Sequence, residues 1–332
     1  MAVTVHECQL SGEEEKGLQM NAYLRNCTLC PRQCHVNRLE GQRGYCGKDA
    51  GLVVARAALH MWEEDCISGK NGSGTVFFSG CSLGCIFCQN YKISRAGQAA
   101  DKTGRLQDAK EGIGTRVTVR RLAEIFLELK GQGANNINLV TPTHYVPQII
   151  EALDMAREEG LNIPVVYNTS GYEKTETLRM LKGYVDIYLP DFKYMDRDIA
   201  AEYSGARDYP LYAKKAVEEM VSQVGEFQID DETGLMTRGV LVRHLVLPGH
   251  VRDSKEVIRY LHETYKDRIL LSIMNQYTPM SQTADHKLLG RKVTKREYGK
   301  VVDYALKLGV ECGYIQEGEA ALQSFIPEFG GA

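Results

Sequence analysis

The run Cys81-Ser82-Leu83-Gly84-Cys85-Ile86-Phe87-Cys88-Gln89-Asn90 stands directly after an apolar, β-branched stretch at Thr75 to Ser79. Three and then two residues separate its cysteines, so one tight loop can bring three thiolates to a cubane iron–sulfur cluster, one for each of three irons. The fourth iron then has no cysteine. Since an open metal position accepts an outside ligand, this spacing predicts chemistry at the metal rather than electron transfer alone. The alternatives are a structural zinc site and cysteines buried as small hydrophobic side chains.

Outward from this loop, apolar runs alternate with helical patterns, as expected for repeated β–α units and a parallel sheet. An amphipathic helix is expected over residues 122–129, with Thr118 as its N-cap. Two polar stretches, residues 96–115 and 225–238, predict loops. Periodicity leaves open whether the sheet is doubly wound or forms a full or partial barrel. The six predicted strands are Thr75 to Ser79, Asn136 to Thr141, Ile163 to Thr169, Val185 to Phe192, Val240 to Leu247 and Arg268 to Met274.

The N-terminal segment, residues 1–74, differs from residues 75–332 in being rich in cysteine and poor in helical repeats. It predicts a small appended metal-binding domain, because four thiolates within twenty residues can bind zinc tetrahedrally or ligate a second iron–sulfur cluster. The sequence leaves open which of these two metal centres is present. His35 or Cys66 can take the place of one of the four cysteine ligands. The remaining thiols, on Cys8, Cys66 and Cys312, are most simply unligated. The four expected ligands are Cys27, Cys30, Cys34 and Cys46.

Composition excludes several classes of protein. The 332 residues are 43% hydrophobic and 25% charged, without the ~20 consecutive apolar residues of a membrane span. The net charge of -3, from 40 basic and 43 acidic side chains, is not that of a nucleic-acid-binding protein. The N-terminus lacks the pattern of a secretory signal, and seven of the ten cysteines fall in two short clusters rather than being spread as in a disulfide framework. A cytoplasmic protein is therefore expected.

The C-x3-C-x2-C spacing, with Phe87 before the last cysteine, resembles the signature of the radical S-adenosylmethionine (radical SAM) superfamily. Within it, the chain resembles relatives of the pyruvate formate-lyase activating enzyme, in which an Asn follows the loop, as Asn90 does here. The likeness runs from about Val76 to Pro279. It implies an α/β fold, a partial (β/α)6 TIM-like barrel, in agreement with the six predicted strands. The N-terminal cysteine pattern also resembles that of relatives of the activating enzyme.

The resemblance implies a [4Fe-4S] cluster on Cys81, Cys85 and Cys88, with S-adenosylmethionine (SAM) bound to the open iron. It further implies that the reduced cluster cleaves SAM to methionine and a 5'-deoxyadenosyl radical, which abstracts hydrogen from a substrate. The expected substrate is a protein or peptide, with activation of a glycyl-radical enzyme as one form of this chemistry. A flavodoxin or ferredoxin is the implied electron donor.

Barrel active sites lie at the C-terminal ends of the strands, and the resemblance assigns cofactor contacts there. Where activating enzymes have Gly-Gly-Glu, this chain has Thr141-Pro142-Thr143-His144, so Thr141 or His144 is expected to supply the polar contact. After the third strand, Asn168-Thr169-Ser170-Gly171 resembles the family's Asp-Thr-Asn-Gly, with Asn168 in place of the acid. That replacement leaves open whether a monovalent cation site exists.

Charged motifs follow on the next strands. Asp191-Phe192-Lys193 matches the family's Asp-x-Lys, and strand alternation directs both charged side chains to the same side. Arg243, ahead of Pro248-Gly249 as in the family, is expected to clamp a carboxylate, the alternative being a buried ion pair with Asp or Glu. Asn275 stands where activating enzymes have a His. The expected cofactor contacts are thus Phe87, Asn90, Thr141, His144, Asn168, Ser170, Asp191, Lys193, Arg243 and Asn275.

Two other functions compete with this one. The same radical chemistry can act on a small molecule or another macromolecule, since the motif after the second strand departs from that of the activating enzymes. A non-catalytic iron–sulfur electron-transfer module is the second alternative. The three-cysteine loop and the large α/β domain both argue against it.

Overall fold

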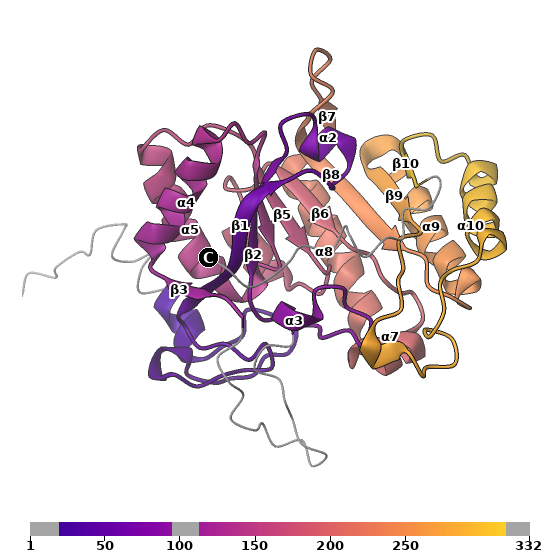
Figure 1. The fold of residues 1–332 in the computed structure, drawn as a ribbon, viewed down its shortest axis with the longest axis horizontal. Helices are drawn as coiled ribbons and strands as arrows, with labels where there is room; N and C mark the ends of the chain where they lie inside the picture. The colour runs from indigo at the N-terminus through magenta and orange to yellow at the C-terminus, as the bar shows by residue number, and fades with distance from the viewer. Residues whose placement is uncertain (1–19, 95–112, 317–332) are drawn as a thin grey trace, which may run out of the picture.

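The fold is built on one open, mostly parallel sheet (Figure 1). A computed structural model of the chain describes residues 20–94 and 113–316. In that part, ten strands form the sheet in the order β10-β9-β8-β6-β5-β4-β2-β1-β3, with β7 paired to β8. No pairing among the described residues joins β10 to β3, so the sheet does not close. The predicted partial barrel is confirmed.

The strands of the partial barrel pair in parallel with their neighbours from β2 through to β9. All six predicted strands are present, and β10 adds a further parallel strand beside β9. They are β2 (Ser73–Phe78), β4 (Ile137–Val140), β5 (Val165–Thr169), β6 (Ile187–Pro190), β8 (Met236–Leu245), β9 (Leu270–Met274) and β10 (Gly313–Ile315). The residues of β2, β4, β5, β6 and β9 are almost all buried, as expected for parallel strands covered by helices, whereas no residue of the edge strand β10 is fully buried.

Helices α4 and α5 lie beside β1 and β2, and α9 and α10 lie beside β9 and β10 (Figure 1). The Thr118 hydroxyl accepts the Arg121 N–H and so caps α4, as predicted. The helices are α2 (Asp65–Ser68), α3 (Tyr91–Ser94), α4 (Val119–Gly131), α5 (Val146–Glu158), α6 (Thr175–Met180), α7 (Arg197–Ser204), α8 (Tyr209–Val224), α9 (Val251–Tyr265) and α10 (Lys295–Leu308). Short 3-10 turns are η1 (Arg38–Glu40), η2 (Thr143–Tyr145), η3 (Lys266–Arg268) and η4 (Ser281–Thr283).

Strands on the N-terminal side of the barrel run antiparallel. β1 (Leu52–His60) pairs antiparallel with β2 and with β3 (Thr115–Val117). The cysteine-rich segment therefore continues into the barrel sheet through β1. The predicted domain boundary near residue 75 stays a prediction.

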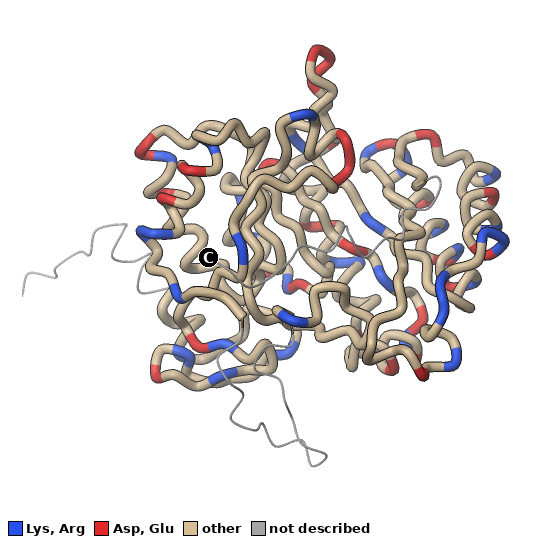
Figure 2. Tube along the Cα trace, viewed as in Figure 1, with Lys and Arg blue, Asp and Glu red and all other residues tan. Residues whose placement is uncertain are grey.

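The two predicted loops have different outcomes. Most of residues 96–115 lies outside the described residues. The loop prediction for residues 225–238 is wrong in part. β8 begins at Met236 rather than at the predicted Val240, and its first residues pair antiparallel with β7 (Gln228–Ile229) to form a hairpin. Asp230 closes the turn by accepting from the Thr233 N–H and hydroxyl, and acidic residues mark its tip in Figure 2. Among the described residues, no helix is long and apolar enough to cross a membrane.

Candidate active site

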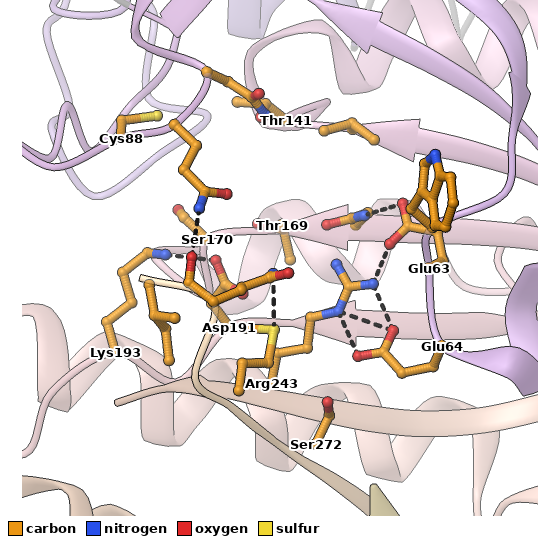
Figure 3. A pocket seen from close by; sticks show the side chains of 18 of the residues that line it. Glu63, Glu64, Cys88, Thr141, Thr169, Ser170, Asp191, Lys193, Arg243 and Ser272 are labelled. Atoms are coloured by element: carbon orange, nitrogen blue, oxygen red, sulfur yellow. Dashed lines mark hydrogen bonds and ion pairs between the residues drawn. The ribbon is translucent and has the colours of Figure 1, made fainter. Parts of the chain in front are cut away.

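A cavity of about 430 Å³ lies inside the partial barrel and reaches the cysteine loop. Its size is in the range of about 300–1,000 Å³ that holds small-molecule cofactors. Cys81, Cys85 and Cys88 all line it. Figure 3 shows Cys88 at one side of the cavity and Glu63 and Glu64 at the other. The cysteine loop and the residues at the ends of the strands therefore share one space.

Each of the three sulfurs accepts a hydrogen bond from the chain. The Leu83 N–H donates to Cys81 Sγ over 3.3 Å, the Ser204 hydroxyl to Cys85 Sγ over 2.9 Å, and the Ser94 hydroxyl to Cys88 Sγ over 3.4 Å. Hydrogen bonds to sulfur favour a negatively charged thiolate. The donors match a set of ligating thiolates better than three inert apolar thiols.

Two of these thiols, Cys85 and Cys88, are costly to ionise without a cation. Burial, together with the negative charges of Cys85 and Cys81, raises the pKa of Cys88 to about 12. A bound metal cluster reverses this balance, because its positive irons neutralise the thiolates. Clustering, hydrogen bonding and the cost of ionising Cys85 and Cys88 thus fit a [4Fe-4S] cluster, which Cys81, Cys85 and Cys88 would hold at the edge of the cavity.

Phe87 forms part of an aromatic wall next to the loop. Its buried ring meets the rings of Tyr194, Tyr203 and Tyr277 edge-on, with centroids 6.2–6.5 Å apart. Edge-to-face packing of this kind is favourable. Phe87 also lines the cavity, where it supplies an apolar surface between Cys85 and Cys88 in the loop.

Asp191 and Lys193 point into the cavity together, as strand alternation predicts, while Phe192 between them is fully buried. Lys193 Nζ lies 2.5 Å from Asp191 Oδ2 (Figure 3). Burial disfavours the ammonium, but the charges of Asp191 and Cys85 outweigh it and raise the pKa of Lys193 above its usual value. The pair therefore presents a cation and a carboxylate to the cavity that the cysteine loop (Cys81 to Cys88, also called the cluster loop) lines.

Four neutral residues of the expected cofactor site also line the cavity: Asn90, Thr141, Asn168 and Ser170. Thr141 has a φ of 58°, a left-handed conformation that residues other than Gly seldom adopt. The Asn168 amide donates to Glu63 Oε1 over 3.4 Å. The structure thus brings residues from the ends of β4 and β5 and from the cysteine loop to one cavity.

Arg243 lines the cavity but is bound by the chain's own acids. Its guanidinium bonds both carboxylate oxygens of Glu64 at 2.6–3.1 Å and also pairs with Glu63 (Figure 3). Burial opposes the charge on Glu64, yet Arg243 lowers the pKa of that carboxyl. Arg243 is therefore found in a buried ion pair with acids of its own chain, which was the alternative to a carboxylate clamp for the cofactor.

Glu63 and Glu64 did not emerge from the sequence, although they line the cavity. Two adjacent acids between β1 and α2 were the available signal, but surface acids are common and nothing local ties them to Arg243. Besides Arg243 and Asn168, Glu63 accepts from the amide of fully buried Asn138 over 2.9 Å.

Two of the expected contacts do not reach the cavity. His144 is buried, its Nε2 lies 2.8 Å from the Ser79 carbonyl, and burial lowers its pKa to about 3, with Arg38 adding to the effect. Asn275 is replaced at the cavity by its neighbours Met274 and Gln276. Strand alternation explains this, since residues on either side of an outward position point inward.

The N-terminal cysteines lie close to one another in space. Cys27, Cys30 and Cys46 are buried, and negative charge on Cys46, Cys27 and Cys34 adds to burial in raising the pKa of Cys30. The Tyr45 N–H donates to Cys34 Sγ over 3.2 Å. Among the described residues, no three His, Cys, Asp or Glu side chains are grouped around a single-ion site. The ligands of a cubane do not converge on one ion, because each binds a different iron.

Comparison with known proteins bears on this site. Residues 75–261 match the family described as the Radical SAM superfamily. A Methanocaldococcus jannaschii protein described as "Uncharacterized protein MJ0674" is 30% identical over 292 residues, covering 87% of this chain and 77% of its own.

Among solved structures, Streptococcus suis SuiB bound to its precursor peptide SuiA is similar, with 18% identity and a TM-score of 0.44. That match covers 72% of this chain and 46% of SuiB, so this chain spans less than half of the SuiB chain. A domain of a pyruvate-formate lyase-activating enzyme from Bacteroides vulgatus is 12% identical, with a TM-score of 0.36, covering 52% of this chain and 92% of that domain.

Proposed function

Because this chain belongs to the radical SAM superfamily, we propose that Cys81, Cys85 and Cys88 hold a [4Fe-4S] cluster and that the adjoining cavity binds SAM. The observation that carries the proposal is the set of three clustered thiols, each with its own hydrogen-bond donor, on one wall of a cofactor-sized cavity. When bound, the cluster and SAM supply one-electron cleavage of a carbon–sulfur bond and hydrogen abstraction by a carbon radical.

The chain's own residues position and polarise the cofactor. The Leu83 N–H and the Ser94 and Ser204 hydroxyls stabilise negative charge on the sulfurs and so favour the reduced state. Asp191 is suited to accept from an ammonium or ribose hydroxyl, and Lys193 to donate to a carboxylate.

Polar contacts from Asn90, Thr141, Asn168 and Ser170 complete the wall, and Phe87 supplies an apolar surface beside it. His144, Asn275 and Arg243 are not needed in this assignment. His144 and Asn275 do not line the cavity, and Arg243 is bound by two acids.

The proposed substrate is a protein or peptide, with a glycyl-radical enzyme as one form of it. Support comes from the sequence resemblance to activating enzymes around Asp191 and Lys193. We propose a flavodoxin or ferredoxin as the electron donor and a cytoplasmic location.

We also propose a second metal centre on Cys27, Cys30, Cys34 and Cys46. An auxiliary iron–sulfur cluster is the form that needs no convergence of the four thiols on one ion, and zinc is the alternative that metal analysis distinguishes from it. The clustering of these thiols and the N–H donor to Cys34 support the second centre. In a chain with Cys81, Cys85 and Cys88 all changed to Ala, metal analysis is expected to find residual iron or zinc. That metal should disappear when Cys27 is also changed to Ala. A triple variant without any metal contradicts the second centre.

The radical function is tested by anaerobic reconstitution with iron and sulfide, reduction, addition of SAM and chromatography for 5'-deoxyadenosine. Wild type and Cys312→Ala are expected to form the product, because Cys312 does not line the cavity. Cys85→Ala is expected to form none. An iron-loaded wild type that binds SAM without cleaving it, even with a peptide pool present, contradicts the proposal.

Deuterium labelling identifies the substrate class. Transfer of deuterium from a labelled peptide or protein pool into 5'-deoxyadenosine supports the proposed substrate. Transfer only from a labelled pool of small metabolites replaces it with the small-molecule alternative.

A further inference from the structure

Arg32 connects the two cysteine groups. It lies between Cys30 and Cys34 in sequence, yet its side chain reaches the barrel. Its Nε donates to the Ser82 carbonyl over 2.9 Å, and Nη2 donates to the Leu83 carbonyl over 3.1 Å. Both acceptors lie inside the loop from Cys81 to Cys88. The N-terminal segment, indigo in Figure 1, lies near α3, which directly follows that loop.

The same guanidinium holds the end of α7. Nη1 donates to the Gly205 carbonyl over 2.7 Å and Nη2 to the Ser204 carbonyl over 3.1 Å. Carbonyls at the C-terminal end of a helix lack intrahelical partners and carry partial negative charge, so a cation is favoured there. Arg32 therefore binds four carbonyls in two segments that meet beside the cluster loop.

The two clamped segments are those that shape Cys85. Ser204 donates its hydroxyl to Cys85 Sγ over 2.9 Å, and the Ile86 N–H donates to the Tyr203 carbonyl over 2.8 Å. Arg32 binds the carbonyl of the same Ser204. A shift of the Arg32 side chain would thus move Ser204 and change its hydrogen bond to the Cys85 sulfur.

Only an arginine can make this set of bonds. Its planar fork offers five N–H donors at fixed angles, whereas a lysine offers a single flexible ammonium. The guanidinium also makes a cation–π contact with the Tyr45 ring, whose centroid is 3.8 Å from the Arg32 Cζ. Tyr45 itself donates its hydroxyl to the Leu83 carbonyl over 3.3 Å.

Arg32 lies in a tight turn formed by residues 27–36, which we call the knuckle. The Cys27 N–H donates to the Val36 carbonyl, and the His35 N–H donates to the Cys27 carbonyl, both over 3.0 Å. Gln33 and His35 have positive φ values of 41° and 56°, which cost energy for residues other than Gly. Four thiolates joined by a metal would hold such a knuckle together, because metal binding in small sites is coupled to folding.

We propose that Arg32 is a positioning residue that makes the order of the Cys81–Cys88 loop depend on metal in the N-terminal cysteine site. The metal holds the knuckle, the knuckle aims Arg32, and Arg32 fixes the cluster loop and Ser204. The proposal rests on the proposed function, since it assigns a role to the second metal centre of the same enzyme. Residues that orient metal ligands from outside typically change metal affinity or activity by roughly 10- to 100-fold when mutated.

The test compares full-length Arg32→Lys and Cys27→Ala with wild type. Arg25→Lys is the matched control, because Arg25 is an exposed arginine of the same segment. Proteins are reconstituted with ferrous iron and sulfide, or loaded with Zn²⁺. The readouts are amide hydrogen exchange over residues 82–86 and 203–205, metal content, and the electron paramagnetic resonance spectrum of the reduced cluster. Exchange in α10 serves as an internal measure of folding.

In Arg32→Lys, amides of the cluster loop are expected to exchange about tenfold faster than in wild type, with the N-terminal metal retained. In Cys27→Ala, the N-terminal metal is lost and the same amides are expected to speed up similarly. Both variants should show an altered cluster spectrum while α10 stays protected. The double variant should be no worse than the stronger single variant, because both act through one path.

Wild-type exchange and spectra in Arg32→Lys overturn the proposal. So does a Cys27→Ala chain that has lost its N-terminal metal but keeps a wild-type cluster loop. Failure of the proposed function has a different signature. In that case loaded wild type forms no 5'-deoxyadenosine, whereas hydrogen exchange still reports whether the two cysteine groups are coupled.

Discussion

The Ser204 hydroxyl donates a 2.9 Å hydrogen bond to the sulfur of Cys85, joining the last residue of α7 to a loop 119 positions earlier in the chain. The Ser204 oxygen also lies 2.8 Å from the Tyr194 hydroxyl. The sulfur is therefore at the end of a buried chain of hydroxyl groups. Such a chain sets how easily negative charge accumulates on the sulfur.

Changing Ser204 to Ala is expected to lower the reduction potential of the reconstituted cluster by about 40 mV. Losing a hydrogen bond worth about 1 kcal/mol to the more negative state has this effect for one electron. Potentiometric titration followed by electron paramagnetic resonance measures the shift. Ser222→Ala is the control, since that hydroxyl donates only to the nearby Glu219 carbonyl in α8. Equal potentials in the two variants would show that the Ser204 bond does not tune the cluster.

Changing Arg243 to Met is expected to destabilise the fold by about 3–5 kcal/mol, because Glu63 and Glu64 would remain buried without their cation. Denaturant unfolding of the metal-free chain measures the loss. Arg121→Met, which removes an exposed pair with Glu128, should cost far less. A loss as small as that of Arg121→Met would mean that Arg243 does not neutralise the two acids.

Changing Lys193 to Met is expected to raise the SAM concentration needed for half-maximal cleavage by roughly 10- to 100-fold, without changing iron content. The reason is loss of the cation that pairs with Asp191 at the cavity wall. Exposed Lys182 provides the control variant, Lys182→Met. An unchanged SAM requirement would remove Lys193 from the cofactor site.

Glu173 predicts a pH-dependent stability. It is fully buried and accepts from the Thr143 hydroxyl over 2.6 Å and from the Thr169 hydroxyl. Burial raises the pKa of Glu173 to about 7. The folded chain thus holds this proton more tightly than the unfolded chain, so the stability linked to it is present below the ordinary Glu pKa of about 4.5. It declines as pH rises to about 7.

Changing Glu173 to Gln removes this titration. Relative to wild type, the variant should gain up to about 3 kcal/mol between roughly pH 5 and pH 8, measured by denaturant unfolding at both values. Glu176→Gln, at an exposed position in α6, is the control and should show no such gain. A pH-independent difference for Glu173→Gln would mean that its carboxyl titrates normally.

Much of the fold follows from local sequence. The six barrel strands and the capped α4 helix are visible as periodic patterns because each side chain's burial depends on its position along its own strand or helix. The cysteine loop is also local, since two short spacings place three thiols on one turn. The paired directions of Asp191 and Lys193 follow from strand alternation for the same reason.

The rest depends on which segments meet when the sheet curls. Arg243 was expected to be a carboxylate clamp, but acids 179 and 180 positions away occupy its guanidinium. His144 was expected at the cavity, but the η2 turn carries it toward Ser79. Neither partner is marked in the local sequence.

The sequence by itself determined the three-cysteine loop, the six barrel strands and the charged pair at Asp191 and Lys193, because these depend on spacing and alternation within a few residues. Only the tertiary structure decided that Arg32 clamps the cluster loop and that Glu63 and Glu64 hold Arg243. Those contacts join distant segments, and hydrogen-bond geometry across such distances exists only after the parallel sheet has brought the segments together.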